Sequence, residues 1–290
     1  MTPRFARVGI VAKPHDEDRE HELRGLIEQL QAAGSTVTLD EQAARLLEGQ
    51  PPGIPRSELA AINDLLIVLG GDGTLLSIAP DAAAANVPVF GVNYGGLGFM
   101  TATPRDELTS TTAAVLAGDY GESTRQLLRA IVDGPQRSEP LVRDVLNDAV
   151  INKTDLARVV ELMATVDGET VSSFVADGLI VCTTTGSTAY SLAAGGPIVM
   201  PEVDAIVLTP ISPHTLSNRP LVLPGKAIVE IALVSRDLQI ILTLDGQEGI
   251  RLHSDDRVTL ERSPYQLRLL GPGKRTYFDV LQTKLRWGSR

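Results

Sequence analysis

An aspartate set among glycines is the first feature of this sequence that could do chemistry. Residues 65–76 read LLIVLGGDGTLL, which places Asp72 directly after a run of apolar residues and a pair of glycines. A buried strand that enters a helix through a glycine turn brings backbone N–H groups together where they can hold an anion. A carboxylate in the middle of that turn would repel a phosphate. We therefore expect Asp72 to handle a proton, while phosphates are held by a metal ion and by the loop of Gly70, Gly71, Gly73 and Thr74.

Three more glycine-containing clusters follow along the chain, at residues 95–99, 185–197 and 245–247. Each of the four clusters, taken singly, has an ordinary structural explanation. GGDG fits a tight turn, Ser187 or Thr188 fits the N-cap of a short helix, and Asp245-Gly246 fits a hairpin turn.

The clusters carry more weight together than apart. They occur in one chain with Asn147-Asp148, at the end of a β run, and with Asp177-Gly178 ahead of another; residues 142–152 as a whole are β-rich. This joint occurrence of short polar segments at strand ends favours a shared binding site over unrelated turns.

The elements that must position these residues change in type along the chain. Apolar or alternating runs predict strands at residues 8–12, 35–39, 65–69 and 88–93, with helices over 16–34 and from Thr103-Pro104 to about 116, where Thr103 is the expected cap. Such alternation is typical of a parallel, doubly wound sheet, whose ligands bind beyond the carboxyl ends of the strands. The glycine turns at 70–74 and 95–98 fall at those ends.

From about residue 120 the sequence consists of short β-rich runs separated by turn residues such as Asp167-Gly168. A short helix over 187–194 interrupts these runs, and a helix over 278–285 follows them. We therefore expect an α/β, Rossmann-like nucleotide-binding domain over residues 1–120, with residues 271–290 packing back onto it. An all-β, sandwich-like domain should occupy residues 121–270.

Composition excludes several classes of function. The net charge of −10 argues against a nucleic-acid surface, and no apolar run approaches the roughly 20 residues that cross a bilayer. The one cysteine, Cys182, lies in an apolar run, which favours a buried, inert thiol. We expect a cytoplasmic protein that binds neither nucleic acid nor membrane.

Several of these motifs resemble those of the bacterial NAD kinase family. The matching segments appear in family order: GGDGT (70–74), GVNYGGLGF (91–99), LNDAVI (146–151), DGLIVCTTTGSTAYSLAAGGPIVMP (177–201), PISPHTLSNRPLV (210–222) and DGQ (245–247). The GGDGT segment alone is shared with phosphofructokinases and with diacylglycerol or sphingosine kinases. The combination of TTGSTAYSLAAGGP and PHTLSNRP is far more specific to NAD kinases.

The sequence departs from the family pattern at two places. Asn147 is followed by Asp148 where the family usually has glutamate, so the carboxylate is one methylene shorter. Thr184 stands where the family usually has proline. The first difference changes the reach of a carboxylate toward a ribose hydroxyl, and the second loosens a turn.

The resemblance implies transfer of the γ-phosphoryl group of ATP to the 2′-hydroxyl of the adenosine ribose of NAD, with Asp72 as the base. It also implies a set of NAD contacts: Asp72, Gly73, Asn147, Asp148, Arg158, Val175, Asp177, Thr188, Ala189, Tyr190, Ser191, Leu192, Ala193 and Gln247. No His, Cys and carboxylate cluster has metal-ligand spacing, so Mg²⁺ or another divalent cation should arrive with the ATP phosphates. A homodimer or homotetramer built through the β domain is expected.

Two other functions remain open at this stage. A related GGDGT kinase would act on a lipid or sugar-phosphate hydroxyl, although a lipid substrate would call for an apolar or basic membrane-facing patch. A non-catalytic dinucleotide-binding sensor would keep the fold without turnover, which the presence of Asp72 disfavours.

Overall fold

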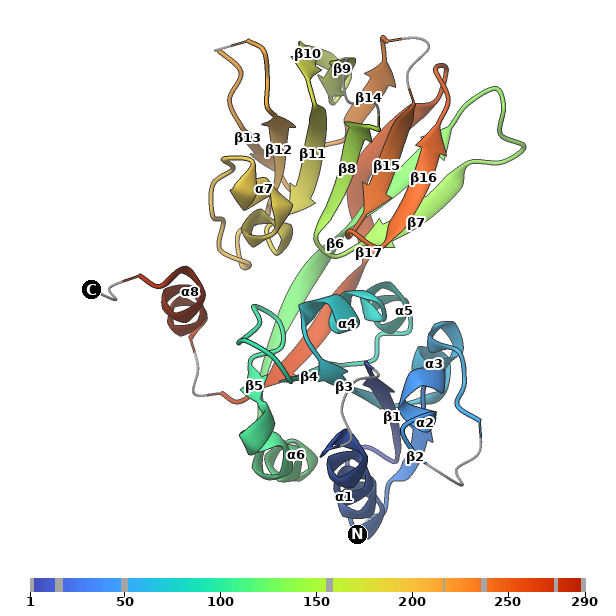
Figure 1. Ribbon diagram of the computed structural model, residues 1–290, viewed down its shortest axis with the longest axis vertical. Coiled ribbons are helices and arrows are strands. Elements are labelled where there is room, and N and C mark those ends of the chain that lie inside the picture. Colours follow the sequence, from blue (N-terminus) through green and yellow to red (C-terminus); the bar gives the residue numbers. More distant parts are fainter. Residues whose placement is uncertain are drawn as a thin grey trace. The chain divides into compact units, whose positions relative to one another are not determined.

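The chain divides into two compact units (Figure 1). The computed structural model describes residues 3–13, 18–47, 52–154, 159–215, 217–235, 239–273 and 276–287. Unit 1 comprises Met1–Thr124 and Gln266–Arg290, and unit 2 comprises Arg125–Tyr265. Two strands, β6 (Gly121–Asp133) and β17 (Arg257–Gly271), contribute residues to both units. The chain thus leaves unit 1 along β6 and returns to it along β17. No helix in the described part of the chain is long and apolar enough to cross a membrane.

Unit 1 is built on a parallel sheet in the order β4-β3-β1-β2. Its strands are β1 (Arg7–Ala12), β2 (Thr36–Leu39), β3 (Leu65–Gly70) and β4 (Val89–Asn93). Every residue of β3 is buried, as its unbroken apolar run predicted. The end of β17 extends the sheet beside β4 through Leu269 and Leu270.

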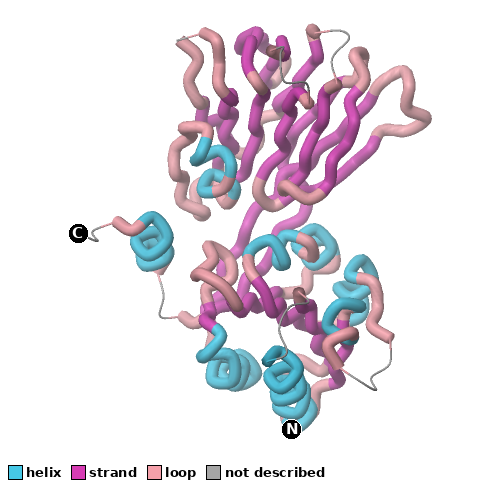
Figure 2. Tube along the Cα trace, viewed as in Figure 1, coloured by secondary structure: helices cyan, strands magenta, loops and turns pink. Residues whose placement is uncertain are grey.

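Helices cover both faces of this sheet, as the doubly wound prediction required (Figure 2). Alternate β1 residues Val8 and Ile10 share one core cluster with Leu23 and Leu30 of α1 and with residues of α6. Gly9 points to the other face, where an added Cβ would crowd Leu59 of α3. The helices of unit 1 are α1 (Asp18–Ala32), α2 (Glu41–Ala44), α3 (Arg56–Ile62), α4 (Asp72–Leu76), α5 (Ala79–Ala84), the 3₁₀ turn η1 (Arg105–Glu107), α6 (Leu108–Ala117) and α8 (Tyr277–Leu285).

The predicted cap at Thr103 is wrong. Thr103 and Pro104 form a short strand, β5, parallel to β4, and the 3₁₀ turn η1 begins only after Pro104. The Thr103 hydroxyl is buried and has no hydrogen-bond partner within the described ranges. The residue before a proline prefers extended backbone, and here that conformation continues the sheet instead of capping a helix.

Unit 2 is a sandwich of two sheets (Figures 1 and 2). One is antiparallel throughout, in the order β13-β12-β11-β8-β15-β16. The other contains β10-β9-β14-β17, with β6 beside β17 and β7. One apolar core cluster draws side chains from both sheets, which confirms the predicted sandwich. The remaining strands are β7 (Leu141–Val145), β8 (Asp148–Lys153), β9 (Val160–Val166), β10 (Glu169–Ala176), β11 (Gly178–Thr183), β12 (Ala205–Ile211), β13 (Leu221–Pro224), β14 (Val229–Leu233), β15 (Ile240–Leu244) and β16 (Glu248–Leu252).

Two Asp-Gly pairs in unit 2 form tight hairpin turns, as predicted. Asp167 and Gly168 join β9 to β10 with φ values of 51° and 83°. Asp245 and Gly246, with φ values of 51° and 67°, are the first two residues of the three-residue turn 245–247 that joins β15 to β16. Positive φ at both central residues is the type I′ geometry, whose twist matches that of the flanking strands.

A buried ion pair ties together the carboxyl ends of β1 and β2 in unit 1. Asp40 is only 1% exposed and accepts N–H bonds from Ala12 at 3.3 Å and Ala43 at 2.7 Å. Arg56 donates to its other oxygen at 2.7 Å, and also to the Ala12 carbonyl and to Ser77 Oγ. The Ser77 hydroxyl in turn donates to the Thr74 carbonyl of α4. This network therefore anchors the end of the short helix that begins at Asp72.

We predict that Arg56→Ala lowers the free energy of unfolding by about 3 kcal/mol, because it leaves the Asp40 carboxylate buried without its cation. Urea denaturation monitored by circular dichroism measures the change. Arg24→Ala is the matched control, since the Arg24–Glu20 pair is about two-fifths exposed and such pairs contribute about 0.5 kcal/mol or less. Equal losses in the two variants would contradict the prediction.

Candidate active site

The Asp72 carboxylate is held by the backbone of a second loop of unit 1. β3 ends at Gly70, and Asp72 is the first residue of α4, after the N-cap Gly71. Its Oδ2 accepts the N–H of Phe99 at 2.8 Å, and its Oδ1 accepts the N–H groups of Met100 at 3.1 Å and Thr101 at 3.0 Å. The Thr101 hydroxyl also donates to Oδ1 at 3.0 Å. The charge therefore lies among donors and not opposite another anion.

The two Asp72 oxygens differ in what they still offer. Each carboxylate oxygen has two acceptor sites. Among the described residues, Oδ1 receives three donors, whereas Oδ2 receives only the Phe99 N–H. Oδ2 is thus the oxygen with an acceptor site left for a substrate hydroxyl. Gly98 makes the arrangement possible, because a Cβ there would overlap both Asp72 Oδ1 and Thr101 Oγ1.

The glycines of the predicted phosphate loop divide into two kinds. The α-carbon of Gly70 packs against Thr74, whose side chain a Cβ at position 70 would overlap. Gly71 and Gly73 border open space, with nothing within 4 Å of an added Cβ. The need for glycine at position 70 is thus explained by packing, whereas Gly71 and Gly73 leave room for a ligand to approach the backbone.

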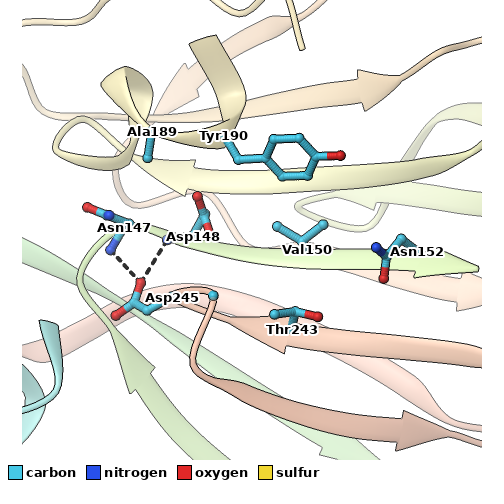
Figure 3. Close-up of a pocket in the computed structure, with 9 residues that line it drawn as sticks. Asn147, Asp148, Val150, Asn152, Ala189, Tyr190, Thr243 and Asp245 are labelled. Carbon is cyan, nitrogen blue, oxygen red and sulfur yellow. Dashed lines mark hydrogen bonds between the residues drawn. The ribbon is translucent and has the colours of Figure 1, made fainter. Parts of the chain in front are cut away.

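Unit 2 holds a cavity of about 310 Å³ on the outer face of the antiparallel sheet (Figure 3). Alternate residues of β8 face it, together with Thr243 of the neighbouring β15 and with the segment that contains α7 (Tyr190–Ala193). Its lining is Asn147, Asp148, Val150, Asn152, Ala189, Tyr190, Thr243, Asp245 and Gly246. Four of the predicted NAD contacts, Asn147, Asp148, Ala189 and Tyr190, are therefore brought together here.

Asp245 organises one end of this cavity. From its tight turn it accepts the N–H groups of Leu146 at 2.8 Å, Asn147 at 2.7 Å and Asp148 at 3.0 Å. These bonds interrupt the run that we read as one strand from 142 to 152. Asn147 consequently lies in the bend between β7 and β8, and Asp148 is the first residue of β8, so a single strand over 142–152 is wrong.

Two carboxyl groups meet at this end, and both have raised pKa values. Burial raises the pKa of Asp148 from 3.8 to about 7, the negative charge of Asp245 adds to this effect, and the Tyr190 N–H opposes it. Burial also raises the pKa of Asp245, against the three N–H groups that it accepts. Near neutral pH Asp148 is therefore balanced between a proton donor and a proton acceptor.

The hydroxyl groups of Ser187, Thr188 and Ser191 bond within the protein, whereas the buried Thr185 hydroxyl has no hydrogen-bond partner among the described residues. Ser187 Oγ donates to the Thr184 carbonyl at 2.7 Å and accepts the Val199 N–H at 3.0 Å, while Thr188 Oγ1 donates to the Thr185 carbonyl. The N-cap interpretation of Ser187 or Thr188 is thus wrong, because Thr185 and Ala189 occupy the N-cap positions of the two short helical turns in this segment. Ser191 is fully buried against Thr209 at 2.8 Å.

The other predicted contacts lie around or away from the cavity. Asp177 sits between β10 and β11 and forms an ion pair with Lys153 at 2.6 Å, which lowers its pKa. Val175 belongs to β10, and its carbonyl accepts the His214 N–H. Gln247 is exposed just after the Asp245 turn. Arg158 lies outside the described residues.

Cys182 is buried, and burial raises the pKa of its thiol to about 12, as expected for an inert cysteine.

Five residues of the cavity are absent from the predicted NAD contacts, namely Val150, Asn152, Thr243, Asp245 and Gly246, although the last two belong to a glycine-containing cluster that the sequence did identify. Strand periodicity could have found the first two, since residues 148, 150 and 152 share one face of β8. Thr243 is opposite Val150 only because β15 pairs with β8 in this register. No local signal in the sequence identifies that pairing.

Comparison with known proteins assigns the family. The description "ATP-NAD kinase N-terminal domain" matches residues 8–120, and "ATP-NAD kinase C-terminal domain" matches residues 146–271. An NAD kinase of Solibacter usitatus is 42% identical over 290 residues, which cover 99% of this chain and 100% of that protein. An NAD kinase of Geobacter sulfurreducens is 42% identical over 98% of this chain and 99% of its own length.

Solved structures agree with the sequence relatives. Yeast NADH kinase complexed with NADH matches with a TM-score of 0.87 and 26% identity, over 98% of this chain and 88% of that one. An NAD kinase from Archaeoglobus fulgidus in complex with ATP matches with a TM-score of 0.73 and 25% identity, over 97% and 98%. The chain belongs to the ATP-NAD kinase family, which confirms the resemblance of its motifs. Its activity is that of an NAD kinase.

The raised pKa of Asp148 predicts a pH-dependent stability. Between about pH 4 and pH 7 the folded state holds a proton at Asp148 that the unfolded state has released, so stability should fall as pH rises. Asp148→Asn removes this effect. As pH rises across that window, the free energy of unfolding of the variant should increase relative to that of the wild type by up to about 1.4 kcal/mol per pH unit. Above the window the difference should stay constant.

Urea denaturation of both proteins at several pH values between 4 and 9 measures this difference. The exposed Asp255→Asn variant controls for the loss of one negative charge. A difference between Asp148→Asn and wild type that does not vary with pH would rule out the shift.

Proposed function

We propose that the chain transfers the γ-phosphoryl group of ATP to the 2′-hydroxyl of the adenosine ribose of NAD, with Asp72 as the group that receives the hydroxyl proton. The observation that carries this proposal is the geometry of Asp72. Three consecutive N–H groups and a hydroxyl fix its carboxylate, and Oδ2 keeps an acceptor site. A fixed carboxylate with one site left for a hydroxyl has the form that a general base requires.

The chemical demand on this base is modest. Phosphoryl transfer passes through a loose transition state, in which positioning and charge stabilisation contribute more than proton removal. Asp72 therefore acts chiefly by orienting the 2′-hydroxyl toward the phosphorus atom. The proton moves from that hydroxyl to Oδ2, and ADP leaves with the electron pair of the broken P–O bond.

We infer that the open backbone around Gly71 and Gly73 approaches the ATP phosphates. Within the described part of the chain no three His, Cys, Asp or Glu side chains gather as a metal cage. We propose that Mg²⁺, or another divalent cation, enters with the phosphate oxygens, which are the hard ligands it prefers. When bound, the cation neutralises phosphate charge.

We propose that the cavity of unit 2 binds the dinucleotide, with Asn147 and Asp148 on hydroxyl groups and the half-exposed Tyr190 ring against a base. Asp148, with a pKa near 7, has both a donor and an acceptor form for a ribose hydroxyl. The remaining contacts in the proposal are Gly73, Arg158, Val175, Asp177, Thr188, Ser191, Leu192, Ala193 and Gln247. Residues 1–120 and 271–290 would form the nucleotide domain, and 121–270 the NAD-binding domain of a cytoplasmic homodimer or homotetramer.

We predict that Asp72→Asn lowers kcat about 100-fold to 10,000-fold, because the amide neither takes up the proton nor accepts all the N–H bonds that hold and orient the carboxylate. NADP formation in a coupled assay measures turnover, and calorimetry measures whether NAD still binds. Asp81→Asn, a half-buried carboxylate of α5 outside the site, is the matched control and should keep wild-type turnover.

The same assay separates the alternatives. NADP formation that survives unreduced in Asp72→Asn would refute the base assignment. Absence of NADP formation by the wild type, with NAD still bound, would favour a sensor over a kinase.

We also predict that Tyr190→Ala raises the KM for NAD about threefold to tenfold and leaves the KM for ATP unchanged, because the lost ring contact serves the dinucleotide alone. Tyr190→Phe keeps the ring and should behave as the wild type. Steady-state kinetics with each substrate varied in turn measures both constants. Equal increases in the two KM values would place Tyr190 outside the dinucleotide site.

A further inference from the structure

The helix α8 contacts the loop that holds Asp72, although it follows the last residue matched by the family descriptions. α8 begins at Tyr277, and a capping box fixes that start, with Thr276 Oγ1 accepting the Asp279 N–H and the Asp279 carboxylate accepting the Thr276 N–H. In Figure 1 it is the red helix near the C-terminus. Both α8 and the loop belong to unit 1.

The contact is made by the ring of Phe99. The rings of Phe99 and Tyr277 lie 6.3 Å apart at an interplanar angle of 41°, a tilted arrangement typical of attractive aromatic pairs. The Lys284 ammonium group lies 5.8 Å from the centre of the same Phe99 ring, within the range of a cation–π interaction. Tyr277 and Lys284 are two helical turns apart, so they belong to one face of α8.

The same face carries the buried residues of the helix. Val280 and Leu281, one turn after Tyr277, are 5% and 2% exposed, whereas Phe278 is 57% exposed. Beside the Phe99 contact lies a cavity of about 340 Å³, lined by Leu97, Pro104, Asp279, Val280 and Thr283. The chain on either side of Phe99 thus borders this cavity, and the Phe99 ring connects the loop to α8.

Phe99 also supplies the N–H group that Asp72 Oδ2 accepts, at 2.8 Å. A shift of the Phe99 ring would move its own backbone, and with it the direction in which Oδ2 presents its remaining acceptor site. We propose that α8 positions the catalytic carboxylate: Tyr277 and Lys284 hold the Phe99 ring, and its N–H group thereby holds Oδ2. This inference rests on the proposed role of Asp72, and in it Tyr277 and Lys284 are positioning residues that act through Phe99.

Two variants test the inference in the full-length chain. Tyr277→Ala removes the ring, and Lys284→Met removes the charge while keeping most of the stem. Phe278→Ala is the matched control, since it truncates an exposed ring at the next position of the same helix. We expect kcat to fall about tenfold in Tyr277→Ala and less in Lys284→Met, with the KM values for ATP and NAD within about twofold of wild type. Phe278→Ala should match wild type.

Amide hydrogen exchange, followed by mass spectrometry of peptides that contain residues 99–101, gives a readout independent of turnover. We expect these amides to exchange about tenfold faster in Tyr277→Ala than in Phe278→Ala, because they lose the anchor that keeps them on Asp72. Thermal unfolding verifies that each variant is folded. If Tyr277→Ala fails to fold, Lys284→Met decides the question.

Each combination of exchange and kinetic results either supports the inference or contradicts it. Faster exchange at 99–101 together with a lower kcat would support it. Unchanged exchange at 99–101 would overturn the inference, and so would faster exchange with kcat unaltered. A loss of kcat accompanied by equal increases in both KM values would indicate general disruption instead of positioning. If Asp72→Asn proved fully active, the base assignment would fail, but the exchange experiment would still show whether α8 holds the loop.

Discussion

The structure of the candidate site depends on how a buried or half-buried aspartate is satisfied by backbone N–H groups. Asp72 stands where a bare carboxylate would oppose phosphate binding, and three consecutive N–H groups of residues 99–101 surround it. Charge-assisted bonds of this kind are about twice as strong as neutral ones. The bond network continues backward, because Asn93 donates to Thr101 Oγ1 at 2.8 Å and accepts the Gly95 N–H at 2.6 Å. The end of β4 is thereby linked to the end of β3 through one carboxylate.

Unit 2 contains the same arrangement, in which one carboxylate accepts three consecutive N–H groups, at a different part of the candidate site. Asp245 accepts three consecutive N–H groups, those of residues 146–148, just as Asp72 accepts those of 99–101. In both cases a carboxylate at a glycine-containing turn fixes a loop from a distant part of the chain. The two loops differ in the side chain that their last residue carries. In unit 2 that residue is Asp148, whose own carboxyl group is buried beside Asp245 and keeps its proton to about pH 7.

The sequence predicted the elements whose signals are local. The unbroken run LLIVL identified β3, the Asp-Gly pairs identified two hairpins, and strand and helix alternation identified the sheet of unit 1. It failed where a distant partner decides the local structure. The break between β7 and β8 follows from Asp245, almost one hundred residues away, and Thr243 enters the cavity only through strand pairing. Serine is a common N-cap residue, which is why Ser187 was predicted as one. Its hydroxyl instead donates to the Thr184 carbonyl and accepts the Val199 N–H.

The aspartate at position 148, where the motif resemblance implies a glutamate, gains a physical meaning from these contacts. The shorter side chain keeps the carboxyl group near the strand, where burial and the Asp245 charge both disfavour ionisation. An ionised glutamate reaching toward a ribose would accept hydrogen bonds only, whereas a carboxyl group balanced near neutrality also donates. Asp245 serves the loop instead, because three consecutive N–H groups of that loop bond to its carboxylate. The pair therefore separates into one carboxylate that builds the site and one carboxyl group that remains available to a hydroxyl.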